Sequence, residues 1–288
     1  MARGAVSRLT RIGVLVAVFM AIAATPAAAS VTLGQLSPGG PGGTCAVADF
    51  AQLSVASGNS YTVPGTGTIT QWSHNANSGV GQSLTLKVLR KVADPNLWQV
   101  IGLDGPRPLT GGLLNAFTVS IPVQAGDILD LDAANGTTAC LFTGLPQDTR
   151  LVRGTSPNLG LGDAGSFNQV SGGGRINVSA VFQPSNVVTV GAIAQNKKKG
   201  TATVSLTLPN PGDLTASGTG VSAASAGRAS ISKAVGAGPA QLQISATGKQ
   251  KKKLRQKGKV TLNVAITYTP TNGDPATQTV AVKLVKKK

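Results

Sequence analysis

The chain has 288 residues, a formal net charge of +16, and no glutamate among its 10 acidic residues. With 37 glycines and many threonines, valines and serines, it is poor in helix formers and rich in strand and turn formers. This composition excludes a predominantly helical protein, and any pair of catalytic carboxylates would have to be two aspartates.

The first 29 residues have the three parts of a secretory signal peptide. Three arginines precede an apolar run over 12–24, and small residues follow at 27–29. The apolar run has about 13 residues, too few for the ~20 that span a bilayer. We therefore expect cleavage near Ala29 and a secreted protein with no transmembrane segment after cleavage, either free outside the cell or retained at its surface.

Both cysteines, Cys45 and Cys140, follow the predicted cleavage site. In an oxidising compartment an even pair is most simply a disulfide. Closing so long a loop would remove on the order of 4–5 kcal/mol of denatured-state entropy. The alternative, a metal site of two thiolates, lacks a close Cys or His partner.

Charge divides the exported chain at a short linker, 184–186. The part from 30 to 186 holds 7 Lys/Arg and 8 Asp, whereas 187–288 holds 16 Lys/Arg and 2 Asp. We predict a Gly/Pro-rich flexible lead-in over 30–44 and a near-neutral domain over 45–183, followed by a basic domain over 187–288.

Short runs with alternating polarity, separated by turn signals, fill the first domain. Strands are predicted at 61–63, 68–74, 84–88, 97–103, 117–123, 128–132, 138–142 and 176–182. Eight or nine such strands are typical of a jelly-roll-like β-sandwich. The Gly-rich stretch 145–174 shows no convincing strand, and a tolerated surface insertion is favoured there over a binding loop or lid.

The basic domain has seven strand candidates. They are 187–193, 201–208, 214–217, 229–235, 242–246, 260–268 and 277–285. The sixth alternates strictly between an apolar and a polar face, as a half-buried strand does. Seven strands in about 100 residues match an immunoglobulin-like sandwich, although the Cys…Trp…Cys core of antibody domains is absent.

If consecutive strands are antiparallel, the loops after the first, third and fifth strands share one pole with the C-terminus. This pole would collect Lys197, Lys198, Lys199, Lys251, Lys252, Lys253, Arg255, Lys257, Lys259, Lys286, Lys287 and Lys288, together with Arg228. The two aspartates of this domain, Asp213 and Asp274, would lie at the opposite pole, beside the first domain.

Such a cluster has two interpretations, and the sequence does not choose between them. It could bind an extracellular polyanion such as an anionic wall polymer, acidic polysaccharide, DNA or anionic lipid headgroups. Alternatively, lysines in turns protect sheet edges and keep a domain soluble. Sequence-specific nucleic-acid recognition is not supported, because aromatic residues do not alternate with the lysines.

Catalytic and metal sites have little support. His74 is the chain's one histidine, and a strand-face residue without a role is favoured over a catalytic triad member. Weak calcium candidates are Asp127, Asp130 and Asp132, since Ca²⁺ takes carboxylate oxygens, but a polar strand face explains them more simply. We expect no cofactor and no enzymatic activity.

The only tryptophans, Trp72 and Trp98, could stack on sugar rings if they are exposed. Large aromatic residues are more often core, particularly where aromatics are scarce. Carbohydrate binding by the first domain is therefore the alternative function.

The second domain resembles the immunoglobulin-like modules of bacterial secreted and cell-surface proteins. The resemblance rests on residues 199–204, 209–212, 267–270 and 282–285. The first domain, through 121–127, is similar to uncharacterised exported β-sandwich domains of high-GC bacteria. Together they imply an exported, non-enzymatic surface, matrix or adhesion protein, whose basic module attaches to anionic envelope polymers.

Overall fold

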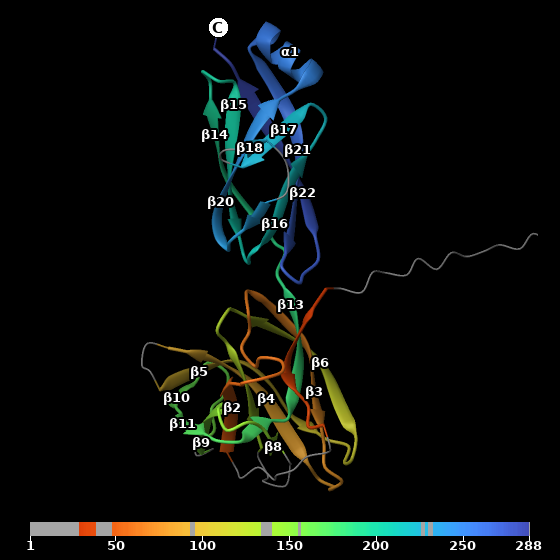
Figure 1. Cartoon of the computed structure of the whole chain (residues 1–288), viewed down its shortest axis with the longest axis vertical. Helices are drawn as coiled ribbons and strands as arrows, with labels where there is room; N and C mark the ends of the chain where they lie inside the picture. Colours follow the sequence, from red (N-terminus) through yellow and green to blue (C-terminus); the bar gives the residue numbers. More distant parts are fainter. Residues whose placement is uncertain are drawn as a thin grey trace, which may run out of the picture.

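A computed structural model describes residues 29–38, 48–92, 96–133, 140–154, 157–225, 228–229 and 233–287. The predicted all-β fold is confirmed, since two β-sandwiches built of antiparallel strands follow one another along the long axis (Figure 1). Among the described residues, no sheet combines strands from both sides of 185–188. Nor does any helix there have the length and apolar character needed to cross a membrane. The predicted signal peptide lies outside the described residues, apart from Ala29.

The first sandwich pairs a four-stranded sheet, β1-β13-β3-β6, with a seven-stranded sheet, β10-β5-β4-β7-β2-β9-β11, and a β12-β8 pair lies beside them. Its strands are β1 (Val31–Gln35), β2 (Ala48–Ser54), β3 (Gly67–Asn75), β4 (Ser83–Lys91), β5 (Leu97–Pro108), β6 (Leu114–Val123), β7 (Ile128–Asp132), β8 (Leu141–Thr143), β9 (Thr149–Gly154), β10 (Ala164–Ser166), β11 (Asn168–Ser171), β12 (Gly174–Ile176) and β13 (Val178–Pro184).

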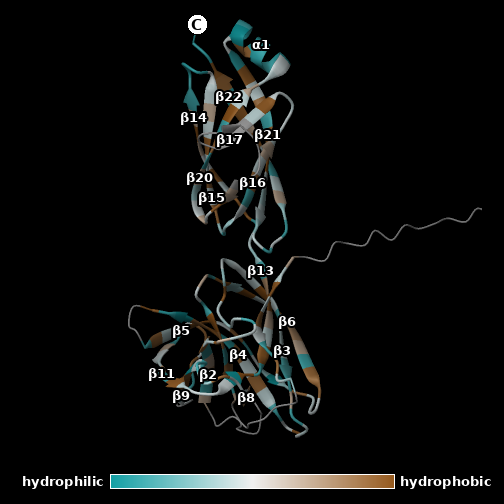
Figure 2. Ribbon diagram, viewed as in Figure 1, coloured by the Kyte–Doolittle hydropathy of each residue, from teal (hydrophilic) through white to brown (hydrophobic). Residues whose placement is uncertain are grey.

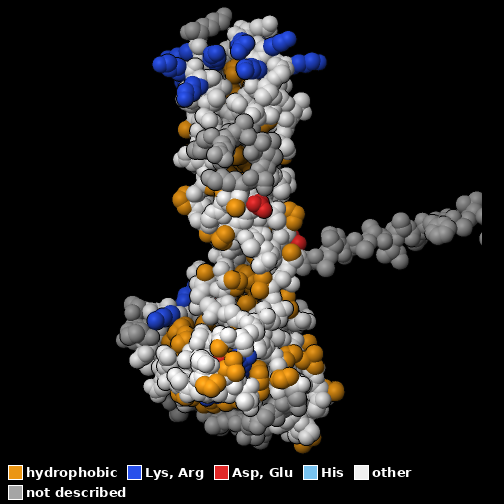
Figure 3. Space-filling model, viewed as in Figure 1, with side chains coloured by type: hydrophobic (Ala, Val, Ile, Leu, Met, Phe, Trp, Pro, Cys, Tyr) orange, Lys and Arg blue, Asp and Glu red, His pale blue; other side chains and the backbone are white. Residues whose placement is uncertain are grey.

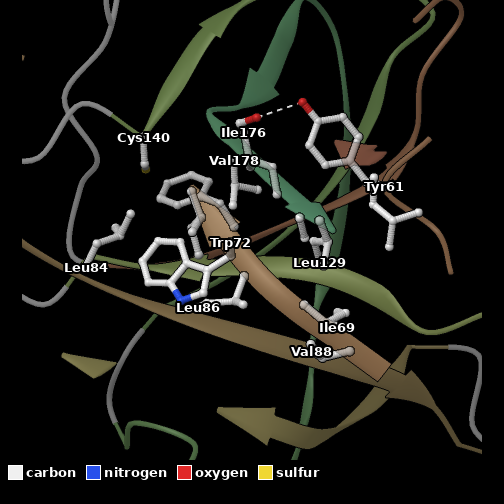
Figure 4. Close-up of a cluster of buried hydrophobic side chains, with 14 of the residues drawn as sticks. Tyr61, Ile69, Trp72, Leu84, Leu86, Val88, Leu129, Cys140, Ile176 and Val178 are labelled. Carbon is white, nitrogen blue, oxygen red and sulfur yellow. Dashed lines mark hydrogen bonds between the residues drawn. The ribbon is translucent and has the colours of Figure 1, made fainter. Parts of the chain in front are cut away.

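The main core lies between these two sheets. Every second residue of a strand points to the same face, so the apolar stripes of β3, β4, β7 and β13 meet there. Trp72 is fully buried at its centre and packs on Phe117 with ring centroids 4.7 Å apart (Figure 4). Tyr61 is buried beside them and donates a hydrogen bond from its hydroxyl to the carbonyl of Ile176 (2.7 Å). Burying each such side chain contributes about 1.5–3 kcal/mol.

The prediction that 145–174 is a structureless insertion is wrong. The stretch contains β9, β10 and β11 and reaches the start of β12. Its strands have only three to six residues and alternate poorly, which is why they leave no clear pattern. Leu159 and Phe167 are buried in a second apolar cluster with Leu89 and Ile128. This stretch thus extends the seven-stranded sheet with β9, β10 and β11, and through Leu159 and Phe167 it covers the face of that sheet that points away from the main core.

The predicted flexible lead-in over 30–44 is also wrong in part. Residues 31–35 form β1, an edge strand whose five residues all pair with β13. Leu33 is buried in the main core, which gives this Gly-rich segment the apolar anchor that it needs to stay in place.

The second sandwich consists of a five-stranded sheet, β14-β15-β20-β17-β18, and a four-stranded sheet, β19-β16-β21-β22. Its elements are β14 (Thr189–Asn196), β15 (Thr201–Leu208), β16 (Gly212–Ser217), β17 (Val221–Ser225), β18 (Arg228–Ala229), β19 (Lys233–Val235), β20 (Gly238–Ala246), α1 (Gly248–Lys257), β21 (Lys259–Pro270) and β22 (Ala276–Val285). Strict alternation of buried and non-buried residues along β21 confirms the predicted half-buried strand.

Two features of the second sandwich were not predicted. The strand expected over 229–235 is instead β18 and β19, which belong to different sheets, and β17 precedes them. The loop expected after β20 contains α1, a helix with one buried side chain, Leu254. A single apolar residue in ten gives no helical period, although Lys, Arg and Gln are good helix formers.

Asn210 joins the two sandwiches. Its side-chain oxygen accepts a hydrogen bond from the Thr66 amide (2.7 Å), and its side-chain nitrogen donates to the carbonyls of Thr66 (2.8 Å) and Ser185 (3.0 Å). The buried Tyr268 hydroxyl donates to the Asn210 carbonyl (2.6 Å) and fixes its position. Gly65 packs closely against the Asn210 side chain, because a Cβ added at Gly65 would collide with the Asn210 side-chain oxygen.

We predict that Asn210→Ala destabilises the first sandwich by about 2 kcal/mol, because it removes three part-buried hydrogen bonds to the backbone of Thr66 and Ser185. Both tryptophans lie in the first sandwich, so tryptophan fluorescence during denaturant unfolding reports on that unit alone. The matched control is Asn186→Ala, which removes one hydrogen bond to the Asp274 carbonyl and should cost less than about 1 kcal/mol. An unchanged fluorescence midpoint in Asn210→Ala would show that the joint does not stabilise the first sandwich.

Candidate functional site

The candidate site is built on α1, at the free end of the second sandwich. Thr247 precedes the helix in an extended conformation, and Gly258 ends it in the left-handed region (φ 70°), where its amide donates to the Leu254 carbonyl (2.9 Å). Leu254 packs into the core of the second sandwich. The basic side chains of the helix are all exposed, namely Lys249, Lys251, Lys252, Lys253, Arg255 and Lys257.

Two further basic segments are joined to the end of α1 by a chain of backbone hydrogen bonds, in which the turn after β14 bonds to the C-terminal segment and that segment bonds to Gly258. The turn after β14 is closed by Asn196, whose carbonyl accepts from the Gly200 amide (2.8 Å). The Lys287 amide donates to the Lys197 carbonyl (2.9 Å), and the Lys286 amide donates to the Gly258 carbonyl (2.8 Å). These contacts hold the turn, the end of the helix and the C-terminal segment together.

We call this end of the molecule the basic pole, and Figures 2 and 3 show hydrophilic, positively charged side chains gathered there. Its members are Lys197, Lys198, Lys199, Lys249, Lys251, Lys252, Lys253, Arg255, Lys257, Lys259, Lys286 and Lys287; all are exposed except Lys286, which is half-buried. Lys288 lies outside the described residues. Within the described chain, no Lys or Arg of the second sandwich forms an ion pair.

Three strands, β17, β18 and β19, stand between β16 and β20 where one was predicted. Because this adds an even number of strands, the later loops still lie at the ends of the sandwich predicted for them. The prediction for Arg228 is wrong, however. It pairs with Ser225 at the end of β17 that points away from the pole, whereas Val221 begins that strand near α1. Beside the turn, a shallow open hollow is lined by Asn196, Lys197, Lys198, Thr203 and Lys287.

Both tryptophans are core residues. Trp72 is 0% exposed and donates its indole N–H to Asp104 (2.7 Å), and Trp98 is 4% exposed. A sugar ring needs an open aromatic face, so stacking on either indole is ruled out. The scarcity of aromatics explains this, since a sandwich with few large side chains uses them to fill its interior.

Two of the three calcium candidates, Asp127 and Asp132, form ion pairs with protein cations, and Asp130 is buried without one among the described residues. Asp127 forms a bidentate ion pair with Arg90 (2.7 and 2.8 Å). It lies just before β7, an odd number of residues from Asp130 and Asp132, so it does not share their face of the sheet. Those two are buried rather than on the polar strand face predicted for them, and they lie beside the ammonium of Lys87. No group of three or more His, Cys, Asp or Glu in the described part of the chain could hold a metal ion.

The arrangement around Lys87 was not predicted. We call it the Lys87 cluster, made of Lys87, Asp49, Asp130 and Asp132. Adjacent strands β4, β7 and β2 bring it together, since Lys87 pairs with Asp130 and Asp132 pairs with Asp49. All four side chains are at most 2% exposed. The available signal was a lysine between apolar residues in β4, opposite aspartates that alternate with leucines in β7.

His74 is buried without an acidic partner. Its Nδ1 donates to the Asn177 carbonyl (2.7 Å), which leaves Nε2 unprotonated, and no described side chain hydrogen-bonds to Nε2. Burial lowers the pKa of His74 to about 4, and the hydrogen bond to Asn177 offsets part of that shift. The ring therefore stays neutral at physiological pH.

Cys140 is fully buried in the main core (Figure 4). Cys45 lies outside the described residues, so the predicted disulfide between the two stays a prediction. Comparison of the chain with protein-family models, curated proteins and solved structures found no match.

His74 should make stability depend on pH between about 4 and 6.5. In this window the unfolded state binds a proton that the folded state does not, so stability falls as pH drops and levels off below about 4. The loss amounts to about 3 kcal/mol across the window. His74→Asn keeps a side-chain donor for the Asn177 carbonyl but cannot titrate. Carboxyl groups with raised pKa values, such as Asp130, titrate in both proteins, so the test is the difference between their stability curves from denaturant unfolding at several pH values. This difference should change by about 3 kcal/mol between pH 6.5 and 4, and parallel curves would contradict the assignment.

Proposed function

We propose that the protein is a secreted, non-catalytic surface or matrix protein, and that its basic pole attaches it to an anionic envelope polymer. One observation supports this above all. Cations from three separate segments of the second sandwich gather at one end, exposed and without anionic partners among the described residues. The first sandwich, at the other end of the long axis, is then the part displayed outward (Figure 3).

The charge distribution favours binding over solubility. Solubility is served by charges of both signs spread over a surface. Here Asp213 and Asp274 both lie away from the basic pole, so no acidic side chain among the described residues offsets the repulsion among its cations. Lysines in the first turn of α1 also oppose the helix dipole. A bound polyanion removes both unfavourable effects.

The nature of the side chains indicates the kind of ligand. Most are lysines, which act as mobile point charges rather than as planar forks that recognise one geometry. Exposed aromatic residues are absent from α1 and from the turn after β14. A flexible polymer with repeated negative charges fits this surface, with affinity set by charge density and salt.

We expect the full chain to be retained on isolated cell wall at low salt and released progressively as salt increases. Replacing Lys251, Lys252 and Lys253 with Gln should weaken retention by on the order of 3 kcal/mol at low salt, roughly a hundredfold, at about 1 kcal/mol per cation near an anionic surface. The three side chains are exposed on α1, so the fold should be unaffected.

The matched control replaces the same three residues with Arg, which keeps the charge and should keep retention within a few-fold. Retention that ignores salt, or equal weakening by the Gln and Arg variants, would refute electrostatic attachment. The lysines would then serve solubility, and the ligand would have to be sought on the first sandwich.

A further inference from the structure

Lys87 and Asp49 are in direct contact inside the first sandwich. The Lys87 ammonium lies 2.6 Å from Asp49 Oδ1 and 3.0 Å from Asp132 Oδ2. Asn158 closes the group, since its side-chain oxygen accepts from Lys87 (2.7 Å) and its side-chain nitrogen donates to Asp132 (2.9 Å). The side chains of Lys87 and Asp49 are 1% and 0% exposed.

The surroundings are apolar and exclude bulk water. The face of the sheet that carries the Lys87 cluster also carries Leu89 and Ile128, and residues 157–167 cover it with Leu159 and Phe167. Burial of charged groups at such a place is costly and opposes the ammonium form of Lys87, but the hydrogen bond to Asp49 and the surrounding carboxyl charges outweigh burial and raise the pKa of Lys87. The reactive amine is therefore the minor form, reached when the Lys87 proton passes to the contacting carboxyl. A neutral, desolvated lysine amine is a good nucleophile.

Asp130 is the unusual member. It is fully buried opposite Lys87, and neither of its carboxyl oxygens has a hydrogen-bond partner among the described residues. Burial, followed by the negative charge of Asp49, raises the pKa of Asp130 well above its usual range. Burial thus favours the acid form of Asp130, which is paired with Lys87 across β4 and β7 but makes no hydrogen bond to it.

We propose that Lys87 and Asp49 join in an intramolecular amide (isopeptide) bond, with Asp130 as the proton carrier. The bond would link β4 to β2 across the intervening β7, between residues 38 positions apart in the chain. The site needs nothing from outside the chain, and the proposal does not depend on what the basic pole binds.

The step balances without a cofactor. A proton passes along the 2.6 Å contact from the ammonium to the carboxylate, which gives the amine and the acid. The lone pair of Lys87 Nζ then attacks Cγ of Asp49 and forms the C–N bond. Asp130, which has no hydrogen bond to Lys87 or Asp49 before the reaction, turns toward the pair, donates its proton to the departing hydroxyl group and takes one from the nitrogen. The C–O bond then breaks and one water leaves. No group is oxidised or reduced.

Asp49 is the acyl donor rather than Asp132 for two reasons. It is the closer of the two to Lys87, and Asp132 is held by the Asn158 amide. The pKa of Asp49 is raised by burial despite the hydrogen bond from Lys87, which favours the acid form that the step requires. Arg153, 3.6 Å from the other oxygen of Asp49, is positioned to stabilise the developing oxyanion.

The test is the intact mass of the denatured, reduced full chain, measured beside Lys87→Met, which shares any processing of the termini. The wild type should be lighter than its sequence by one water, and Lys87→Met should have its full mass. A tryptic map should show that cleavage after Lys87 is lost and that a branched peptide contains Asp49. A full wild-type mass with normal cleavage after Lys87 would overturn the proposal without reliance on any variant.

Two further variants assign the roles. In Asp49→Asn the attack would expel ammonia, so this variant should lose ammonia or keep its full mass. Loss of one water there, or a branch at Asp132, would overturn Asp49 as the donor.

Asp130→Asn keeps the shape of the Asp130 side chain but removes the acid. The crosslinked fraction should then fall at least tenfold at equal times after refolding, while circular dichroism confirms the fold. Crosslinking at the wild-type rate would overturn the role of Asp130.

Discussion

The seven-stranded sheet is buried on both faces along β4, β7 and β2, and the first sandwich depends on this constraint. One face meets the four-stranded sheet through apolar side chains. The other carries Lys87 and three aspartates, which would be solvated if residues 157–167 did not cover them. Removing these groups from water is costly, so they must neutralise one another. The short ion pairs of Lys87, the raised pKa of Asp130 and the proposed amide all reduce the buried charge, and the amide reduces it most completely.

The second sandwich handles charge in the opposite way. Its cations stay in water at one end, and α1 is held to the core by one apolar side chain, Leu254. Repulsion at that end is tolerated because the sandwich beneath it is rigid, with β21 paired to β22 over ten residues. A basic end of this kind forms a fixed surface rather than a tail, so a ligand meets charges that are already in place.

The sequence predicted what depends on local alternation and missed what depends on tertiary contact. The alternation of apolar and polar residues over 260–268 predicted β21, because one face of that strand is in water. The burial of Lys87 was not predicted, since alternation cannot tell a solvated face from one that a distant segment covers. That segment, 145–174, looked irregular because its short strands gain their order from pairing with the sheet that they extend. The gathering of lysines at one end was predictable, because strand parity depends only on how many reversals the chain makes.

The joint decides how attachment at the basic pole would act on the rest of the molecule. The first sandwich is connected to the second through β13 and the hydrogen bonds of Asn210, and β13 belongs to the four-stranded sheet. Tension applied at the pole would therefore enter that sheet first, through its pairing with β1 and β3. The proposed Lys87–Asp49 bond lies in the other sheet, where it would resist unfolding and proteolysis but would not carry the tension directly. Attachment and crosslinking are thus separable physically, and the loss of one would leave the other in place.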